Sequence, residues 1–119
     1  MILLAAPVSA APQTPSLDPM TRTFAYCAGR LSAQMEFQWL MSDPQSDRTA
    51  AQRAAMLSLL EAVVSEAGAR EALSLRISAK QAHNALLTRA TFGPQTEDAH
   101  YARLRAEAEI GNCLSLILS

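Results

Sequence analysis

The placement of proline is the feature that most constrains this chain of 119 residues. Four of its six prolines fall within residues 1–19, and only Pro44 and Pro94 follow. Proline lacks an amide donor and keeps the preceding residue out of helical geometry. The sequence therefore predicts an extended N-terminal segment, followed by three long stretches in which helices can form.

Apolar side chains recur every three or four residues in these stretches, which is the period of a helix with one buried face. We expect a first helix over residues 21–41 that buries Phe24, Ala28, Leu31, Met35 and Trp39. A second is expected over residues 47–67, with Asp43 or Asp47 as its cap and a buried stripe of Ala50, Ala54, Leu57, Leu60 and Val64.

Two further helices are predicted by the same spacing. The third covers residues 70–91 and buries Leu75, Ala79, Ala82, Leu86 and Ala90, with Leu73, Ile77 and Leu87 beside them. It ends at Phe92-Gly93-Pro94, and Thr96 caps the fourth. The fourth helix buries Ala99, Ala102, Ala106, Ile110, Cys113 or Leu114, and Ile117. A turn is expected at Gly68, although one long kinked helix would also fit the pattern.

Four such helices joined by short connections predict an all-α, up-down-up-down four-helix bundle over residues 21–119. This topology brings the start of the first helix and the end of the last to one end of the bundle. Cys27 and Cys113 lie in those two regions. We therefore expect a disulfide between them if the chain reaches an oxidising compartment, and two buried free thiols if it stays in the cytosol.

The N-terminal segment supports export. Residues 1–10 combine a short apolar run with Val8-Ser9-Ala10, a small-x-small ending that suits signal peptidase, although no basic residue precedes the run. The segment is interpreted as a signal peptide, with residues 11–20 as a proline-rich linker; a start upstream of Met1 and an accidental likeness are the alternatives. The predicted location is periplasmic or secreted, with no membrane span.

Charge excludes some classes of partner. Ten Lys and Arg balance eleven Asp and Glu, which leaves a net charge of -1 and no attraction toward nucleic acid. No haem-attachment motif, phosphate-binding glycine loop or nucleophile motif is present. The sequence predicts no cofactor and no catalytic residues, and it favours a binding or accessory protein with a protein partner or self-association.

Two polar groups on the later helices are candidate ligand sites. Arg76, Lys80 and His83 share one flank of the third helix, where they predict either a solvated surface or a groove for an anion. Glu97 and His100 form one half of a di-iron motif whose second half is absent, so they are weak metal ligands at best. A metal or anion carrier is the alternative function, and a small enzyme using these helices is a more remote one.

The first helix also carries an excess of aromatic residues. Tyr26, Phe37 and Leu40 lie around the side of its buried stripe. A helix more apolar than one buried face requires is either central in the bundle or presents a docking surface for a partner or a second copy. These three residues are therefore the candidate interaction surface.

Overall fold

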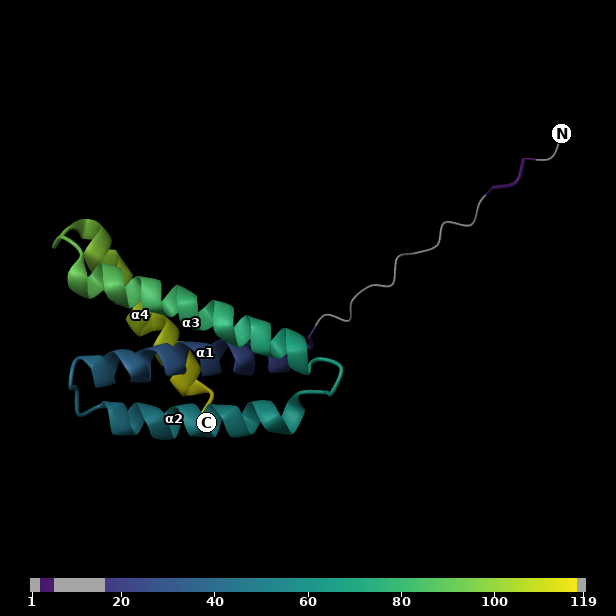
Figure 1. Cartoon of the computed structure of the whole chain (residues 1–119), viewed down its shortest axis with the longest axis horizontal. Coiled ribbons are helices and arrows are strands. Elements are labelled where there is room, and N and C mark those ends of the chain that lie inside the picture. Colours follow the sequence, from purple (N-terminus) through teal and green to yellow (C-terminus); the bar gives the residue numbers. More distant parts are fainter. Residues whose placement is uncertain (1–2, 6–16, 118–119) are drawn as a thin grey trace.

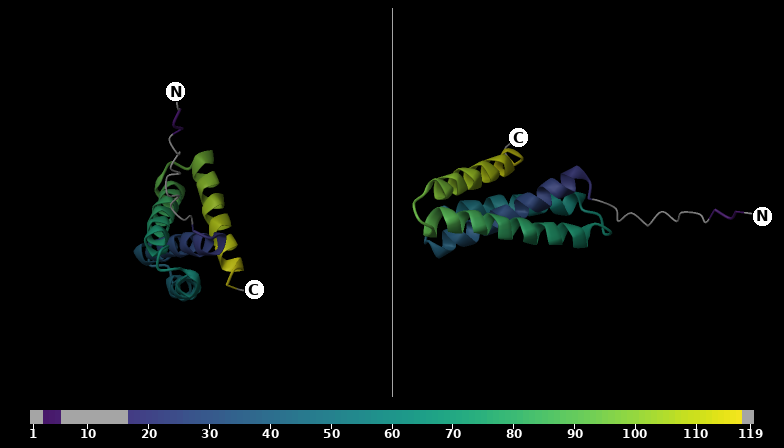
Figure 2. Two further views of the ribbon diagram at one scale, coloured as in Figure 1. Left: turned by 90° about the vertical axis from the view of Figure 1, so that its right-hand side faces the viewer. Right: turned by 90° about the horizontal axis from the view of Figure 1, so that it is seen from above.

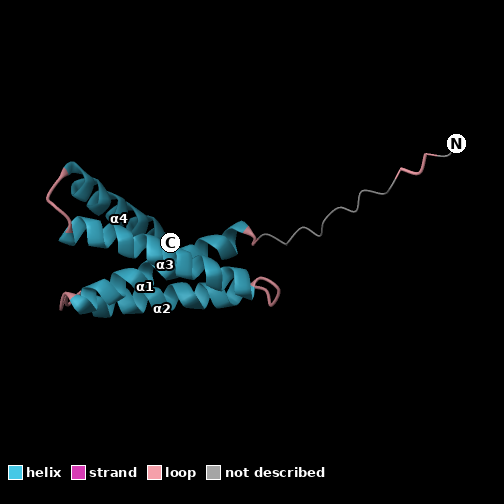
Figure 3. Cartoon of the chain, turned by 45° about the horizontal axis from the view of Figure 1, so that its top comes forward, coloured by secondary structure: helices cyan, strands magenta, loops and turns pink. Residues whose placement is uncertain are grey.

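The computed structural model describes residues 3–5 and 17–117, which include four helices and no strand (Figures 1 and 3). The helices are α1 (Pro19–Leu40), α2 (Ser46–Val63), α3 (Ala69–Phe92) and α4 (Glu97–Ser115). This confirms the all-α, four-helix prediction and shows α2 and α3 as separate helices. Most of the expected signal peptide and linker, residues 1–2 and 6–16, lies outside the described residues.

The four helices run up-down-up-down, and α1 is the element that the others share. It packs against α2 on one side and α3 on another, while α4 returns along α3 and crosses over α1 (Figures 1 and 2). Because α2 and α3 pack mainly on α1 rather than on each other, the bundle is open between them.

The start of α1 is fixed by its own sequence. Asp18 is the N-cap, and its carboxylate accepts from the backbone N–H of Thr21 at 2.9 Å and from the Thr21 hydroxyl at 2.6 Å. Pro19 occupies the first helical position, where its missing amide hydrogen costs nothing. These bonds lower the pKa of Asp18. Leu17 is buried just before the cap, in a cluster with Ala25, Leu60 and Ala72.

The start of α2 corrects one expectation. Neither Asp43 nor Asp47 caps the helix; the N-cap is Gln45, whose side chain makes no capping bond. Asp43 instead accepts from the backbone N–H of Gln45 at 2.9 Å, which closes the turn after Pro44. Asp47 lies in the first turn of α2, where its charge complements the helix dipole.

The later boundaries largely follow the sequence. The turn expected near Gly68 is present, although α2 ends at Val63, four residues earlier than predicted. Gly93 ends α3, and Thr96 caps α4 by accepting from the backbone N–H of Ala99 at 3.5 Å. The glycine, proline and threonine signals between α3 and α4 were therefore sufficient to place that connection.

Several predicted core positions are wrong by one or two residues. Trp39 is 55% exposed because Gln38 takes the inward position on the last turn of α1. Ala54 is exposed and Met56 is buried, and on α3 His83 takes the inward place expected of Ala82. The helical period fits two adjacent stripes almost equally well, so polar residues can occupy the buried one. His83 has hydrogen-bond partners there, whereas Gln38 Oε1 has none among the described residues. Half-exposed Leu73 and Ile77 on α3 follow from the open space beside α2.

The packing of α3 on α1 beside Gly29 requires a glycine. A Cβ atom placed on Gly29 would collide with the backbone carbonyl of Arg76 and lie 3.0 Å from the Cβ of Ala79. Gly29 is buried in the middle of α1, where glycine is otherwise unfavourable. Gly29 is therefore required for packing, because only a residue without a side chain lets the backbones of α1 and α3 come this close.

A disulfide joins α1 to α4. Cys27 and Cys113 are bonded, with their Cα atoms 5.5 Å apart. Both are buried and pack with Ala28, Leu31 and Met56, so the bond lies inside a hydrophobic cluster shared by α1, α2 and α4. This confirms the predicted pairing and ties the C-terminal end of α4 to the N-terminal half of α1.

Candidate functional site

The interior holds a group of polar side chains, here called the inner polar cluster: Tyr26, Arg30, Gln34, His83 and Glu109. Arg30 from α1 is 5% exposed and His83 from α3 is 0% exposed. Arg30 Nη1 lies 3.1 Å from His83 Nδ1, and His83 Nε2 lies 2.9 Å from Gln34 Oε1. The cluster therefore connects the facing sides of α1 and α3.

The partners of His83 fix its protonation. A guanidinium only donates hydrogen bonds, so Nδ1 must accept from Arg30 and the ring hydrogen must lie on Nε2, which donates to Gln34. Burial and the neighbouring Arg30 charge lower the pKa of His83 to about 4. His83 is therefore neutral at neutral pH, and its buried ring cannot reach a substrate.

Glu109 brings α4 into the cluster. It accepts from the Tyr26 hydroxyl at 3.0 Å and from Arg105 Nε at 2.9 Å, and it lies 3.7 Å from Arg30 Nε. Burial raises its pKa, but the bonds from Arg105 and Tyr26 and the Arg30 charge outweigh burial and lower it. The Arg30 guanidinium also stacks over the Tyr26 ring at 4.6 Å. The cluster thus joins three helices in one polar contact.

The sequence contained a weak signal for this cluster that was not recognised. Tyr26, Arg30 and Gln34 are spaced at four-residue intervals, so they share one side of α1, and Arg105 and Glu109 have the same spacing on α4. Nothing in the sequence shows that these two rows face each other. Helical spacing places His83 on a flank with Arg76 and Lys80, and its buried partner, Arg30, lies 53 residues away in the sequence.

The structure separates the three residues of the expected anion groove. Arg76 and Lys80 line a surface hollow of about 170 Å³ between α2 and α3, whereas His83 lies inside. Lys80 pairs with Glu36 at 2.8 Å. Arg53 from α2 joins this hollow, with its Nε donating to the Ser32 hydroxyl at 2.7 Å. Three cations and one carboxylate leave the hollow with two net positive charges.

A second hollow of about 180 Å³ continues from the first and shares Leu73 and Arg76 with it. Its other lining residues are mostly apolar: Leu57, Leu60, Glu61, Val64, Ala69 and Ala72. We call the two hollows together the α2–α3 groove. Leu73 and Ile77 are 50% exposed along it, and Arg76 makes no side-chain hydrogen bond or ion pair with any described residue.

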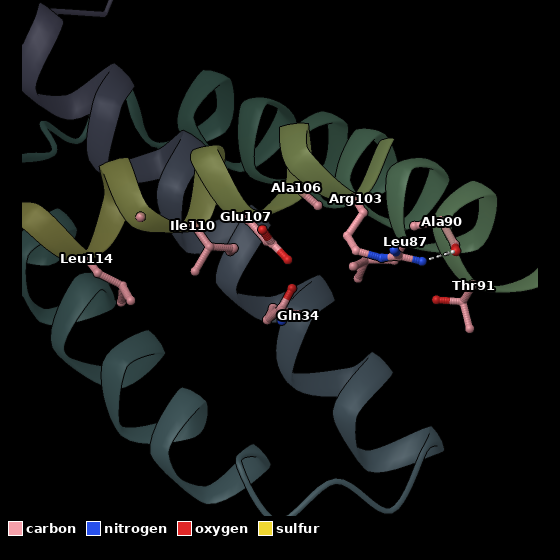
Figure 4. A pocket seen from close by; sticks show the side chains of 10 residues that line it. Gln34, Leu87, Ala90, Thr91, Arg103, Ala106, Glu107, Ile110 and Leu114 are labelled. Atoms are coloured by element: carbon pink, nitrogen blue, oxygen red, sulfur yellow. Dashed lines mark hydrogen bonds between the residues drawn. The ribbon is translucent and has the colours of Figure 1, made fainter. Parts of the chain in front are cut away.

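A larger pocket of about 360 Å³ lies elsewhere, between α3 and α4 with Gln34 of α1 at its floor (Figure 4). We call it the α3–α4 pocket. Its apolar lining includes Leu87, Ala106, Ile110 and Leu114, and its charged residues are Arg103 and Glu107. Arg103 Nη2 donates to the backbone carbonyl of Ala90 at 3.3 Å. No sequence pattern indicates this pocket, because its walls come from three helices.

The expected interaction surface is divided by the fold. Tyr26 is half-buried beside Glu109, and Phe37 is half-buried with its ring 6.3 Å from that of Phe92 in an edge-on arrangement. Leu40 is exposed on the last turn of α1, next to exposed Trp39 and Met41. Only Leu40 of the three predicted residues lies on an open apolar surface.

Glu97 and His100 are both exposed on the first turn of α4. Within residues 3–5 and 17–117, no group of three or more His, Cys, Asp or Glu side chains comes together in a metal-binding arrangement. Over the same residues, no helix is both long and apolar enough to cross a bilayer.

Comparison with known protein families, curated proteins and solved structures finds no match.

Proposed function

We propose that this chain is an exported, non-catalytic binding protein that receives a helical segment of a partner protein in the α2–α3 groove. The observation that carries the proposal is the combination of Arg76, which lacks a partner among the described residues, with half-exposed Leu73 and Ile77 on the same open side of α3. An arginine without a partner beside exposed apolar side chains is typical of a surface that binds another protein.

The shape of the groove favours a helix. Two antiparallel helices flank it, and Gly29 and Ser32 of α1 line its cationic hollow (Figure 1). A partner helix with apolar side chains at positions i, i+3, i+4 and i+7 presents them along one side. These side chains can pack into such a groove as they do between the helices of a bundle. The accessible apolar side chains of the groove, Leu57, Val64 and Leu73, would receive that stripe.

The charge of the groove favours an acidic partner. Its three cations exceed its two carboxylates, Glu36 and Glu61, by one charge. Lys80 pairs with Glu36, while Arg53 donates only its Nε to Ser32 and Arg76 is free of described partners. Aspartate or glutamate beside the apolar stripe of the partner would pair with Arg53 and Arg76 in a partly desolvated contact. The partner is therefore an amphipathic helix with acidic flanks.

The experiment is titration of a labelled synthetic helix of about 20 residues, with a leucine stripe and glutamate flanks, measured by fluorescence anisotropy. We expect saturable binding that weakens about tenfold when Arg53→Gln and Arg76→Gln are combined. Leu73→Ser should also weaken it. The matched control is Leu104→Ser on α4, because Leu104 is 51% exposed and lies outside the groove.

Two outcomes would contradict this function. One is equal binding of a peptide in which lysine replaces every glutamate, since the groove would then have no charge preference. The other is an equal loss of peptide affinity in Leu73→Ser and Leu104→Ser, which would indicate nonspecific binding to exposed leucines. Circular dichroism of each variant shows that the fold is retained.

Export is supported by the disulfide and by the signal-like residues 1–10. Its test is the intact mass of the protein from its own cells, measured without reduction after alkylation of free thiols. A mass that lacks about ten N-terminal residues and carries no alkyl group is expected. Full length with two alkylated cysteines would show that the chain is neither processed nor oxidised.

A further inference from the structure

Arg103 and Glu107 in the α3–α4 pocket are oppositely charged residues one helical turn apart that do not pair. Arginine and glutamate at this spacing are neighbours on a helix surface and commonly form an ion pair. Here Arg103 turns toward α3 and donates to the Ala90 carbonyl, and neither charge is in an ion pair with any described residue (Figure 4). Two separated charges of opposite sign thus line one pocket.

The other walls add an acceptor and an apolar surface. Gln34 Oε1 accepts from His83 and retains a second lone pair, and its position is fixed by the inner polar cluster. Ile110 and Leu114 line the same pocket with Leu87. Gly111 also lines it, and a Cβ there would meet no atom within 4 Å, so the space beside this turn of α4 is open.

We propose that the α3–α4 pocket binds a small zwitterion with an apolar side chain, of the chemical class of a free α-amino acid such as leucine. The ligand ammonium group donates to the Glu107 carboxylate and the Gln34 oxygen, and the ligand carboxylate accepts from the Arg103 guanidinium. The apolar side chain lies against Ile110 and Leu114. The pocket volume of about 360 Å³ is at the lower end of the range typical of small-molecule sites.

This proposal is independent of the proposed function, since none of these residues lines the α2–α3 groove. The test is isothermal titration of the purified chain with L-leucine, with L-leucinamide as the cation-only analogue and N-acetyl-L-leucine as the anion-only analogue. Leucine is expected to bind about tenfold more tightly than either analogue. Glycine, which lacks the apolar side chain, should bind more weakly than leucine.

Two variants assign the charges. Glu107→Gln should weaken leucine about tenfold and leave N-acetyl-L-leucine unchanged, because that analogue has no ammonium group. Arg103→Gln should weaken leucine binding by a similar factor and leave L-leucinamide binding unchanged, because leucinamide has no carboxylate. The matched controls are Glu97→Gln and Arg89→Gln, which remove exposed charges outside the pocket and should not alter binding.

The proposal is overturned if leucine shows no saturable binding up to about 10 mM, the weak end of specific recognition. It is also overturned if both analogues bind as well as leucine, or if the control variants weaken binding as much as the pocket variants. Retained melting temperatures in all four variants show that a loss of binding is not a loss of fold.

Discussion

His83 is a neutral histidine held inside the protein by a permanently charged arginine, and this arrangement makes stability depend on pH. Its pKa is about 4 in the folded chain and about 6.5 when unfolded. Between pH 4 and 6.5 the unfolded chain binds more protons than the folded chain does. The free energy of unfolding is therefore highest above pH 6.5 and decreases as the pH falls toward 4. We expect the free energy of unfolding to fall by about 3 kcal/mol because of His83, as measured by urea unfolding at several pH values in that range.

Two variants separate His83 from other titrating groups. His83→Gln should flatten the pH dependence in this range, leaving the part that comes from carboxylates such as Glu109, whose lowered pKa acts in the same direction. His100→Gln removes the exposed histidine of α4 and should retain the full dependence. An unchanged slope in His83→Gln would show that this residue is not the source.

Two glycines inside helices should respond in opposite ways to the same substitution. Gly29→Ala would force the new methyl group against the Arg76 carbonyl and should destabilise the chain by about 1–3 kcal/mol. Gly111→Ala meets open space and should stabilise it by about 0.5–1 kcal/mol through helix propensity. Thermal unfolding of the two variants side by side tests this. An unchanged or raised melting temperature in Gly29→Ala would contradict the packing at Gly29, and a lowered one in Gly111→Ala would contradict the open space there.

At the scale of the element, α4 is held on α3 by small side chains. Ala99, Ala102 and Ala106 are buried where α4 packs near Leu86, Leu87 and Ala90. Ala102→Leu should therefore push α4 away from α3 and cost about 1–3 kcal/mol. Ala108→Leu is the matched control, because Ala108 is exposed on the same helix. Chemical denaturation of both variants measures the difference, and equal stabilities would mean that α4 is not closely packed at this point.

The elements themselves could be predicted from the sequence because their signals are local. Pro44, Gly93 and Thr96 act on neighbouring residues, and apolar spacing identifies a helix without knowledge of its partners. Which stripe is buried depends on those partners. Arg53 lies toward α1 because Ser32 accepts its Nε–H, and this contact spans 21 residues. In α2, Leu60 is buried as predicted, whereas Ala54 is exposed and Met56, outside the predicted stripe, is buried.

The candidate sites were less predictable than the helices. Arg76 and Lys80 do share a hollow, but its third cation, Arg53, comes from another helix. The inner polar cluster and the α3–α4 pocket each draw residues from three helices, so they exist only after packing. Single-sequence periodicity describes one helix at a time and does not carry this information.

At the scale of the whole molecule, the Cys27–Cys113 bond crosslinks two cysteines that are 86 residues apart. Closing so long a loop stabilises the folded state by about 4 kcal/mol through the lost entropy of the unfolded chain. This is a large part of the free energy of unfolding of a typical domain, which is roughly 5–15 kcal/mol. The double variant Cys27→Ala and Cys113→Ala should therefore unfold at a markedly lower urea concentration, and a midpoint equal to that of the parent would contradict a role in stability.

The distance between these cysteines along the chain also has a consequence for biosynthesis. During synthesis Cys27 appears 86 residues before its partner, and α1 appears before every helix that covers it. A nascent chain therefore exposes a reactive thiol and an uncovered central helix until α4 has been made. A product truncated before α4 retains that unpaired thiol, so oxidative folding distinguishes it chemically from the finished protein.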